Sequence, residues 1–250
     1  MPHLAFHMSV ARDLANAERH AAVEADRGAF YLGSTGPDMR ILSRGDRISS
    51  HYFDLDCLEH QNSVESFFSA HGDLKVASKL EGATAAFVAG YLTHLVVDEL
   101  WITDIYRPYF GPESKLGGDA RANVLDRILQ YEMDLQRRRD RSAMREIRGQ
   151  LLATSLDVHL PFLENELLVR WRDVVAEMAS RPPTWERFPR TASRFLAVAG
   201  VSTDAEIDEF SKTLPAMLQE TKAHVGREHI DAFARRASTF ALKALQEYLR

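Results

Sequence analysis

The sequence lacks several features that mark secreted or nucleic-acid-binding chains. It contains one cysteine, Cys57, in 250 residues, which excludes an internal disulfide framework and fits a reducing compartment such as the cytoplasm. The first residues, MPHLAFHMSVARDLA, have neither the basic start nor the apolar core of a signal peptide, so secretion by that route is not expected. The net charge of -5 provides no basic field, and we therefore expect no nucleic-acid partner.

Strand patterns and long uninterrupted apolar runs are also scarce. No run of alternating β-branched residues stands between turn dipeptides, whereas helix-forming patterns fill most of the chain. The most apolar stretch is AAFVAGYLTHLVVDELWI, and His94, Asp98 and Glu99 interrupt its second half. We therefore expect a buried core helix and no transmembrane segment. The sequence predicts an all-α, multi-helix bundle, with helices over 7–31, 59–71, 76–106, 120–140, 162–180, 184–199, 203–222 and 226–249.

Within the apolar stretch, His94 and Asp98 stand four residues apart and would share one helix face. A buried carboxylate without a partner is costly, so something must compensate Asp98. Two explanations stay open from these residues alone. The two side chains form a buried hydrogen-bonded pair, or they are two ligands of one metal ion.

Three other polar residues stand in separate, partly apolar segments: Asp38 after the turn-forming GSTGP, His51 in SSHYFD, and His7 near the start of the first expected helix. Taken singly, each has a simpler explanation. Asp38 would be a turn residue, and each histidine would be a core residue whose ring nitrogens have hydrogen-bond partners. Taken with His94 and Asp98, they make a set of nitrogen and oxygen donors that suits zinc. Spacing alone does not show that the segments converge.

The order of these motifs resembles the zinc-dependent phospholipase C family, which shares an all-α fold with the fungal single-strand nucleases. The residues that carry the resemblance are His7, YLGSTGPD, SSHYF and GYLTHLVVDELW, over about residues 1–110. The resemblance implies a multi-helix bundle of that type. It also implies that one zinc ion is held by Asp38, His51, His94 and Asp98, and that Asp98 bridges to a second zinc that His7 helps to bind.

The function implied by this resemblance is zinc-dependent hydrolysis of a small-molecule or lipid-derived phosphate ester. Asp38 and Asp98 would be the catalytic residues, with Asp38 acting either as a ligand or as an oriented base. Near the motifs in sequence, Tyr31, Arg40 and Arg47 are either phosphate contacts or solvated side chains.

Two other functions stay open. One is a metal-stabilised helical binding module without catalysis, for which QRRRDRSAMREIR would offer an anion-binding surface unless it is only a solvated helix end. The other is a plain helical protein whose buried histidine and aspartate pair only with each other.

The sequence departs from the secreted members of the family. They carry a second helix with an HxxxE motif and a processed N-terminal tryptophan. Here the one HxxxE after residue 98, HVGRE at 224–228, contains a glycine and lies across the break between two expected helices, and the chain begins Met-Pro-His. Glu132 and Asp134 are candidate substitutes, although a solvated helix face explains both more simply. We therefore expect one tight zinc, with a second bound weakly or only together with substrate.

No repeat or low-complexity linker divides the chain, and the best candidate for a boundary between two parts lies at about 141–160. We expect a single domain over residues 1–250, with a metal-binding part over about 1–140 and a helical part over about 150–250. The second part would cover the first or serve as an oligomer surface, and a homo-oligomer stays open.

Overall fold

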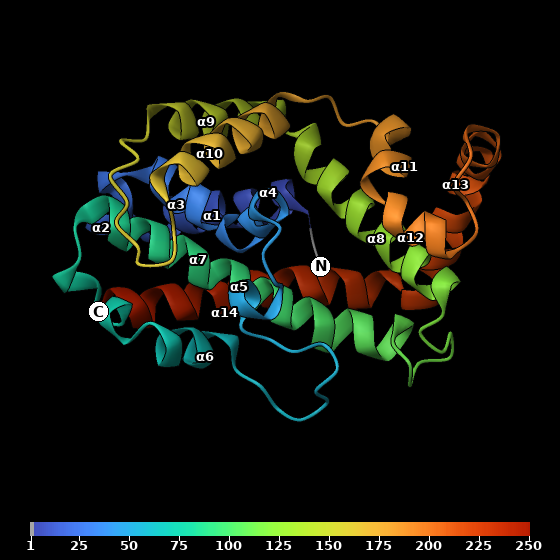
Figure 1. The fold of residues 1–250 in the computed structure, drawn as a ribbon, viewed down its shortest axis with the longest axis horizontal. Helices are drawn as coiled ribbons and strands as arrows, with labels where there is room; N and C mark the ends of the chain where they lie inside the picture. The colour runs from blue at the N-terminus through green and yellow to red at the C-terminus, as the bar shows by residue number, and fades with distance from the viewer. Residues whose placement is uncertain (1–2) are drawn as a thin grey trace.

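The computed structural model describes residues 3–250, and over this range the protein is an all-α, multi-helix bundle, which confirms the predicted fold class. It contains fourteen α-helices joined by short 3-10 turns and no strand within these residues. Two long helices, α7 (Gly82–Trp101) and α14 (Arg227–Leu249), lie side by side across the middle of the molecule (Figure 1). The short helix α3 (Arg27–Gly33) packs against another side of α7.

Helix α7 is the central element of the fold. It continues beyond Trp101 as the π-helical segment η4 (Ile102–Phe110), which contains Pro108. Within residues 3–250, Gly82–Phe110 is the one helix long and apolar enough to cross a membrane, and 83% of its most apolar window is buried inside the protein. This burial agrees with the predicted core helix.

Helices α3 and α7 cross at two glycines. A Cβ atom added at Gly90 would lie 2.0 Å from the carbonyl oxygen of Phe30, and one added at Gly33 would lie 2.0 Å from that of Phe87. Only glycine allows the two backbones to approach this closely. The crossing places Ser34, the residue after α3, beside α7 at the level of His94.

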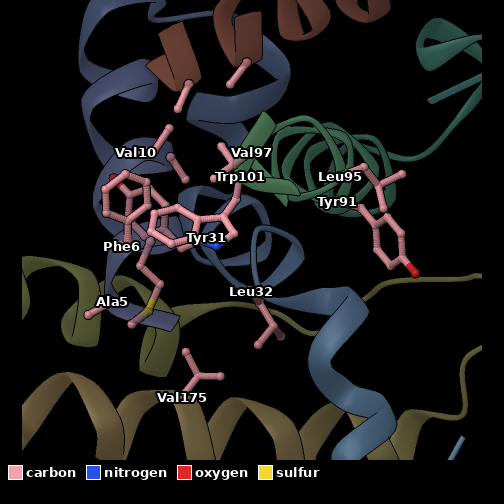
Figure 2. Packing of buried hydrophobic residues seen from close by; sticks show 14 of the residues in the cluster. Ala5, Phe6, Val10, Tyr31, Leu32, Tyr91, Leu95, Val97, Trp101 and Val175 are labelled. Atoms are coloured by element: carbon pink, nitrogen blue, oxygen red, sulfur yellow. The ribbon is translucent and has the colours of Figure 1, made fainter. Parts of the chain in front are cut away.

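The apolar core joins the two ends of the chain. Figure 2 shows side chains of α1 (Leu4–Glu18), α3 and α7 packed together, among them Phe6, Tyr31 and Trp101. From α14, Phe233 stacks on Phe6 at 5.8 Å between ring centroids and meets the Trp101 ring edge-on at 5.0 Å. The last helix therefore packs directly against the helices that carry the candidate metal ligands.

The expected helix over 7–31 is three helices in the structure: α1, α2 (Ala21–Ala25) and α3. Arg19 ends α1 in the left-handed conformation. His20 then caps α2, and the Asp26 carboxylate accepts a hydrogen bond from the Ala29 amide at the start of α3. The continuous hydrophobic pattern is thus interrupted by two capping residues, which favour new helix starts.

The candidate boundary at 141–160 contains a helix that the sequence did not predict. Asp140 separates α8 (Ala120–Arg139) from α9 (Arg141–Ala153) and caps α9 by accepting hydrogen bonds from the Ser142 and Ala143 amides. The chain then continues through α10 (Asn165–Ser180), α11 (Phe188–Thr191), α12 (Ser193–Val198) and α13 (Asp204–Val225). The division into two parts stays a prediction.

Candidate metal centre

The structure brings together all five residues that the sequence selects as metal ligands. His7 comes from α1, and Asp38 from the 3-10 turn η1 (Gly36–Met39). His51 is the last residue of α5 (Ile48–His51), and His94 and Asp98 lie one turn apart on α7. Four segments that are distant in sequence therefore meet at one point.

Asp98 lies at the centre of the cluster. The Nε2 atoms of His51 and His94 are each 3.3 Å from its Oδ2 atom, and Nε2 of His7 is 3.3 Å from its Oδ1 atom. All three nitrogens and both oxygens are buried, and none has a hydrogen-bond partner among the residues described. Five unpartnered polar atoms in one place are unusual, because each costs about 1–3 kcal/mol when nothing compensates it.

The spacing of these atoms fits a tetrahedral metal ion. Ligands about 2.0–2.1 Å from a tetrahedral zinc lie about 3.3–3.4 Å from one another. The His51 and His94 contacts to Asp98 have this length, and Nε2 of His51 lies 3.6 Å from Oδ1 of Asp38. Two overlapping groups, His7–His94–Asp98 and Asp38–His51–His94, each bring their donor atoms within 4.8 Å of one another and could hold a metal ion.

Backbone and hydroxyl groups fix the orientation of two imidazoles. Nδ1 of His94 lies 2.9 Å from the carbonyl oxygen of Ser34, and Nδ1 of His51 lies 2.9 Å from the Ser50 hydroxyl. A carbonyl oxygen only accepts, so Nδ1 of His94 carries a proton and the neutral ring presents its lone pair at Nε2. Such outer contacts are typical of metal-binding histidines.

The charges of the cluster are strongly coupled. Burial raises the pKa of the Asp98 carboxyl, but the positive charge of His94 and the imidazole contacts outweigh burial and hold this pKa well below its ordinary value. Burial lowers the pKa of His94, yet the Asp98 charge leaves it raised. For His7, burial and the His94 charge lower the pKa. Without a metal, one protonated imidazole is enough to neutralise the charge of the Asp98 carboxylate. The Nε2 atoms of the other two imidazoles are then not needed for this purpose.

Asp38 marks the side of the cluster that is open to solvent. Its side chain is 16% exposed, against 1% for His51 and 3% for Asp98. Burial raises the pKa of Asp38, but the contact with His51 and the His94 charge lower it overall, so the carboxylate is ionised.

Arg47 belongs to the same network of charges. Burial lowers the pKa of its guanidinium, and the negative charges of Asp98 and Asp38 act in the opposite direction. This coupling places the Arg47 charge within electrostatic range of the two carboxylates. Arg47 Nη1 also donates to the carbonyl oxygen of Phe53 at 2.8 Å, which fixes the side chain near the segment of His51. Arg47 is therefore not a solvated surface residue, whereas Tyr31 is fully buried in the core.

Glu132 and Asp134 belong to neither metal group, and both are buried, so the solvated helix face expected for them is wrong. Glu132 accepts from Lys222 at 2.9 Å. Asp134 accepts from the Ala5 amide at 2.8 Å, and Arg138 lies 3.6 Å from it. The two carboxylates connect α8 to α13 and to the start of α1, and no local sequence pattern indicates these distant partners.

The Arg-rich stretch is only partly a surface. Arg138 is fully buried beside Asp134 and donates to the carbonyl oxygen of Pro182. Arg141 donates to the carbonyl oxygens of Arg181 and Ser180. These contacts connect the α8–α9 junction to the end of α10, which leaves fewer arginines for an anionic partner than the sequence suggests.

No protein-family model, no curated protein and no solved structure matches this chain. The resemblance to the phospholipase C family therefore stays a prediction from the order of the motifs.

Proposed function

We propose that the protein is a zinc-dependent hydrolase of phosphate esters. The observation that supports this is the cluster of His7, Asp38, His51, His94 and Asp98, with buried, unpartnered donor atoms at tetrahedral spacing and one edge open to solvent. A His94–Asp98 pair alone leaves the positions of His7 and His51 unexplained.

Asp38, His51, His94 and Oδ2 of Asp98 would hold the tight zinc ion. His7 and Oδ1 of Asp98 would contribute to a second, weaker site. When bound, zinc would supply Lewis acidity toward a phosphoryl oxygen and would lower the pKa of a water molecule to about 7.

The other steps fall to side chains at the open edge. Oδ1 of Asp38 faces His51, which leaves Oδ2 of Asp38 to accept a proton from the attacking water. The Arg47 guanidinium, within range of both carboxylates, would offset the charge that develops on the phosphoryl group. The buried positions of His94 and Asp98 would keep bulk water away from the reacting atoms.

Untagged protein purified without chelators is expected to contain at least one equivalent of zinc per chain by elemental analysis. We expect hydrolysis of at least one member of a panel of nitrophenyl phosphodiesters, short-chain phosphatidylcholine and single-stranded nucleic acid, with activity lost in chelator and restored by zinc. Zinc without turnover on any of them would favour the binding module. A folded protein that takes up no metal would favour the simple pair of buried residues.

The His7→Ala variant is expected to keep one tight zinc and to lose roughly a hundredfold in kcat, the size of losing one preorganised electrostatic group. The second site depends on His7 and one oxygen of Asp98, fewer than the three protein ligands usual for catalytic zinc. Competition with a chromogenic chelator would count the sites, and the exposed His60→Ala provides the matched control. Loss of all zinc from His7→Ala would show that His7 belongs to the tight site.

A further inference from the structure

A separate pocket of about 490 Å³ adjoins the segments that carry Asp38 and His51. None of the five candidate ligands lines it, but Pro37, Ser50 and Tyr91, which do, stand next to them in sequence or one helical turn away. The Tyr91 hydroxyl donates to the carbonyl oxygen of Ser50. The volume is in the range of small-molecule sites.

Much of the pocket wall is apolar. Met39, Tyr91, Phe162 and Leu167 contribute to it. Phe162 is 38% exposed although its ring lies only 4.4 Å from the His71 ring, so its outer face is free to contact a ligand. Apolar surface of this kind gains free energy when a ligand removes it from water.

One cation in this wall forms no ion pair, although the Asp46 carboxylate belongs to the same wall. Arg40 is half-buried, its Nε atom is buried, and the side chain makes no hydrogen bond or ion pair within residues 3–250. The other charged or titratable groups of the wall are engaged. Asp46 accepts from the Ser49 amide, and Nε2 of His71 lies 2.7 Å from the Tyr52 hydroxyl.

His71 adds no positive charge near neutral pH, because burial lowers its pKa. The pocket thus combines apolar walls with one partially desolvated guanidinium. A guanidinium in such a place favours a carboxylate or phosphate partner, because charge-assisted hydrogen bonds are the strong ones. The wall contains one guanidinium, and its planar fork matches the single charge and planar shape of a carboxylate.

We propose that this pocket binds a carboxylate attached to an apolar chain, with the carboxylate on Arg40 and the chain along Tyr91, Phe162 and Leu167. This site is separate from the metal centre, and binding there requires no turnover. The proposal therefore stands or falls independently of the proposed phosphate-ester hydrolysis.

The test is titration calorimetry of the protein as purified with octanoate, compared with octanol and octylamine. We expect octanoate to bind, and the neutral alcohol and the amine to bind at least tenfold more weakly. Arg40→Gln should weaken octanoate binding by about tenfold or more, the usual size of a charge-assisted hydrogen bond. Arg148→Gln, at an exposed arginine on α9 outside the pocket, should bind octanoate like the wild type.

Leu167→Trp provides a second variant, because the larger side chain would fill the pocket and leave Arg40 in place. It should also abolish octanoate binding while the circular dichroism spectrum and zinc content stay unchanged. Three results would overturn the proposal: no octanoate binding to the wild type, equal binding to Arg40→Gln, or equal binding of octanol.

Discussion

The Asp98→Asn variant is expected to bind no zinc and to unfold at the same temperature in zinc as in chelator. Asp98 is the one residue that faces three imidazoles, with Oδ2 toward His51 and His94 and Oδ1 toward His7. An asparagine amide keeps the shape but removes the charge and one of the two acceptor oxygens. Both metal positions therefore lose a ligand in a single substitution.

The expected effect is large. A ligand present at a thousand times its Kd stabilises the folded state by about 4 kcal/mol. For a protein of this size that corresponds to roughly 8–16 °C in Tm. Wild-type protein should show this difference between zinc and chelator by differential scanning calorimetry, and Asp98→Asn should show none. Hydrolysis should fall to the level of the chelated wild type.

Asp126→Asn is the matched control for this variant. Asp126 is equally buried, but it accepts hydrogen bonds from Trp101 and Gln130 and lies outside the metal groups. It should lower Tm in zinc and in chelator alike and keep the difference between them. If Asp98→Asn behaves in the same way as this control, Asp98 is a structural carboxylate and not a ligand.

Two residues of the candidate site could be selected from the sequence because they break a local rule. His94 and Asp98 stand out in an apolar helix, since a buried charge requires a partner. Asp38, His51 and His7 carry no such local signal, and the order of motifs alone selected them. Their meeting depends on the α3–α7 crossing and on short turns, which spacing in sequence does not encode.

Other contacts of the site had no sequence signal at all. The carbonyl oxygen of Ser34 that orients His94 is a backbone atom, and every residue has one. The buried Nε atom of Arg40 has no hydrogen-bond partner, and only the three-dimensional surroundings show this. In the fold, the hydrophobic pattern does not indicate the capped breaks at His20, Asp26 and Asp140, because it continues across them. By contrast, the start of α13 has a local sequence signal, because Thr203 and Glu206 form a capping box there.

The second large effect is expected from Gly90→Ala, which should lower the free energy of unfolding by about 3 kcal/mol or more. The added Cβ atom would lie 2.0 Å from the carbonyl oxygen of Phe30 and 2.8 Å from the amide nitrogen of Ser34. Both are backbone atoms, so α3 must move away from α7 as a whole. Zinc affinity should fall too, since the carbonyl oxygen of Ser34 would move away from Nδ1 of His94.

Gly149→Ala separates this contact from the general effect of adding a methyl group to a helical glycine. Gly149 is exposed on α9, and a Cβ atom there would meet no atom within 4 Å. Alanine should therefore stabilise the protein by roughly 0.5–1 kcal/mol, because it reduces the freedom of the unfolded chain. Urea unfolding monitored by circular dichroism, with zinc titration of each variant, would measure both quantities. The same substitution should thus have opposite signs at the two sites, and equal effects would mean that α3 and α7 do not cross at the glycines.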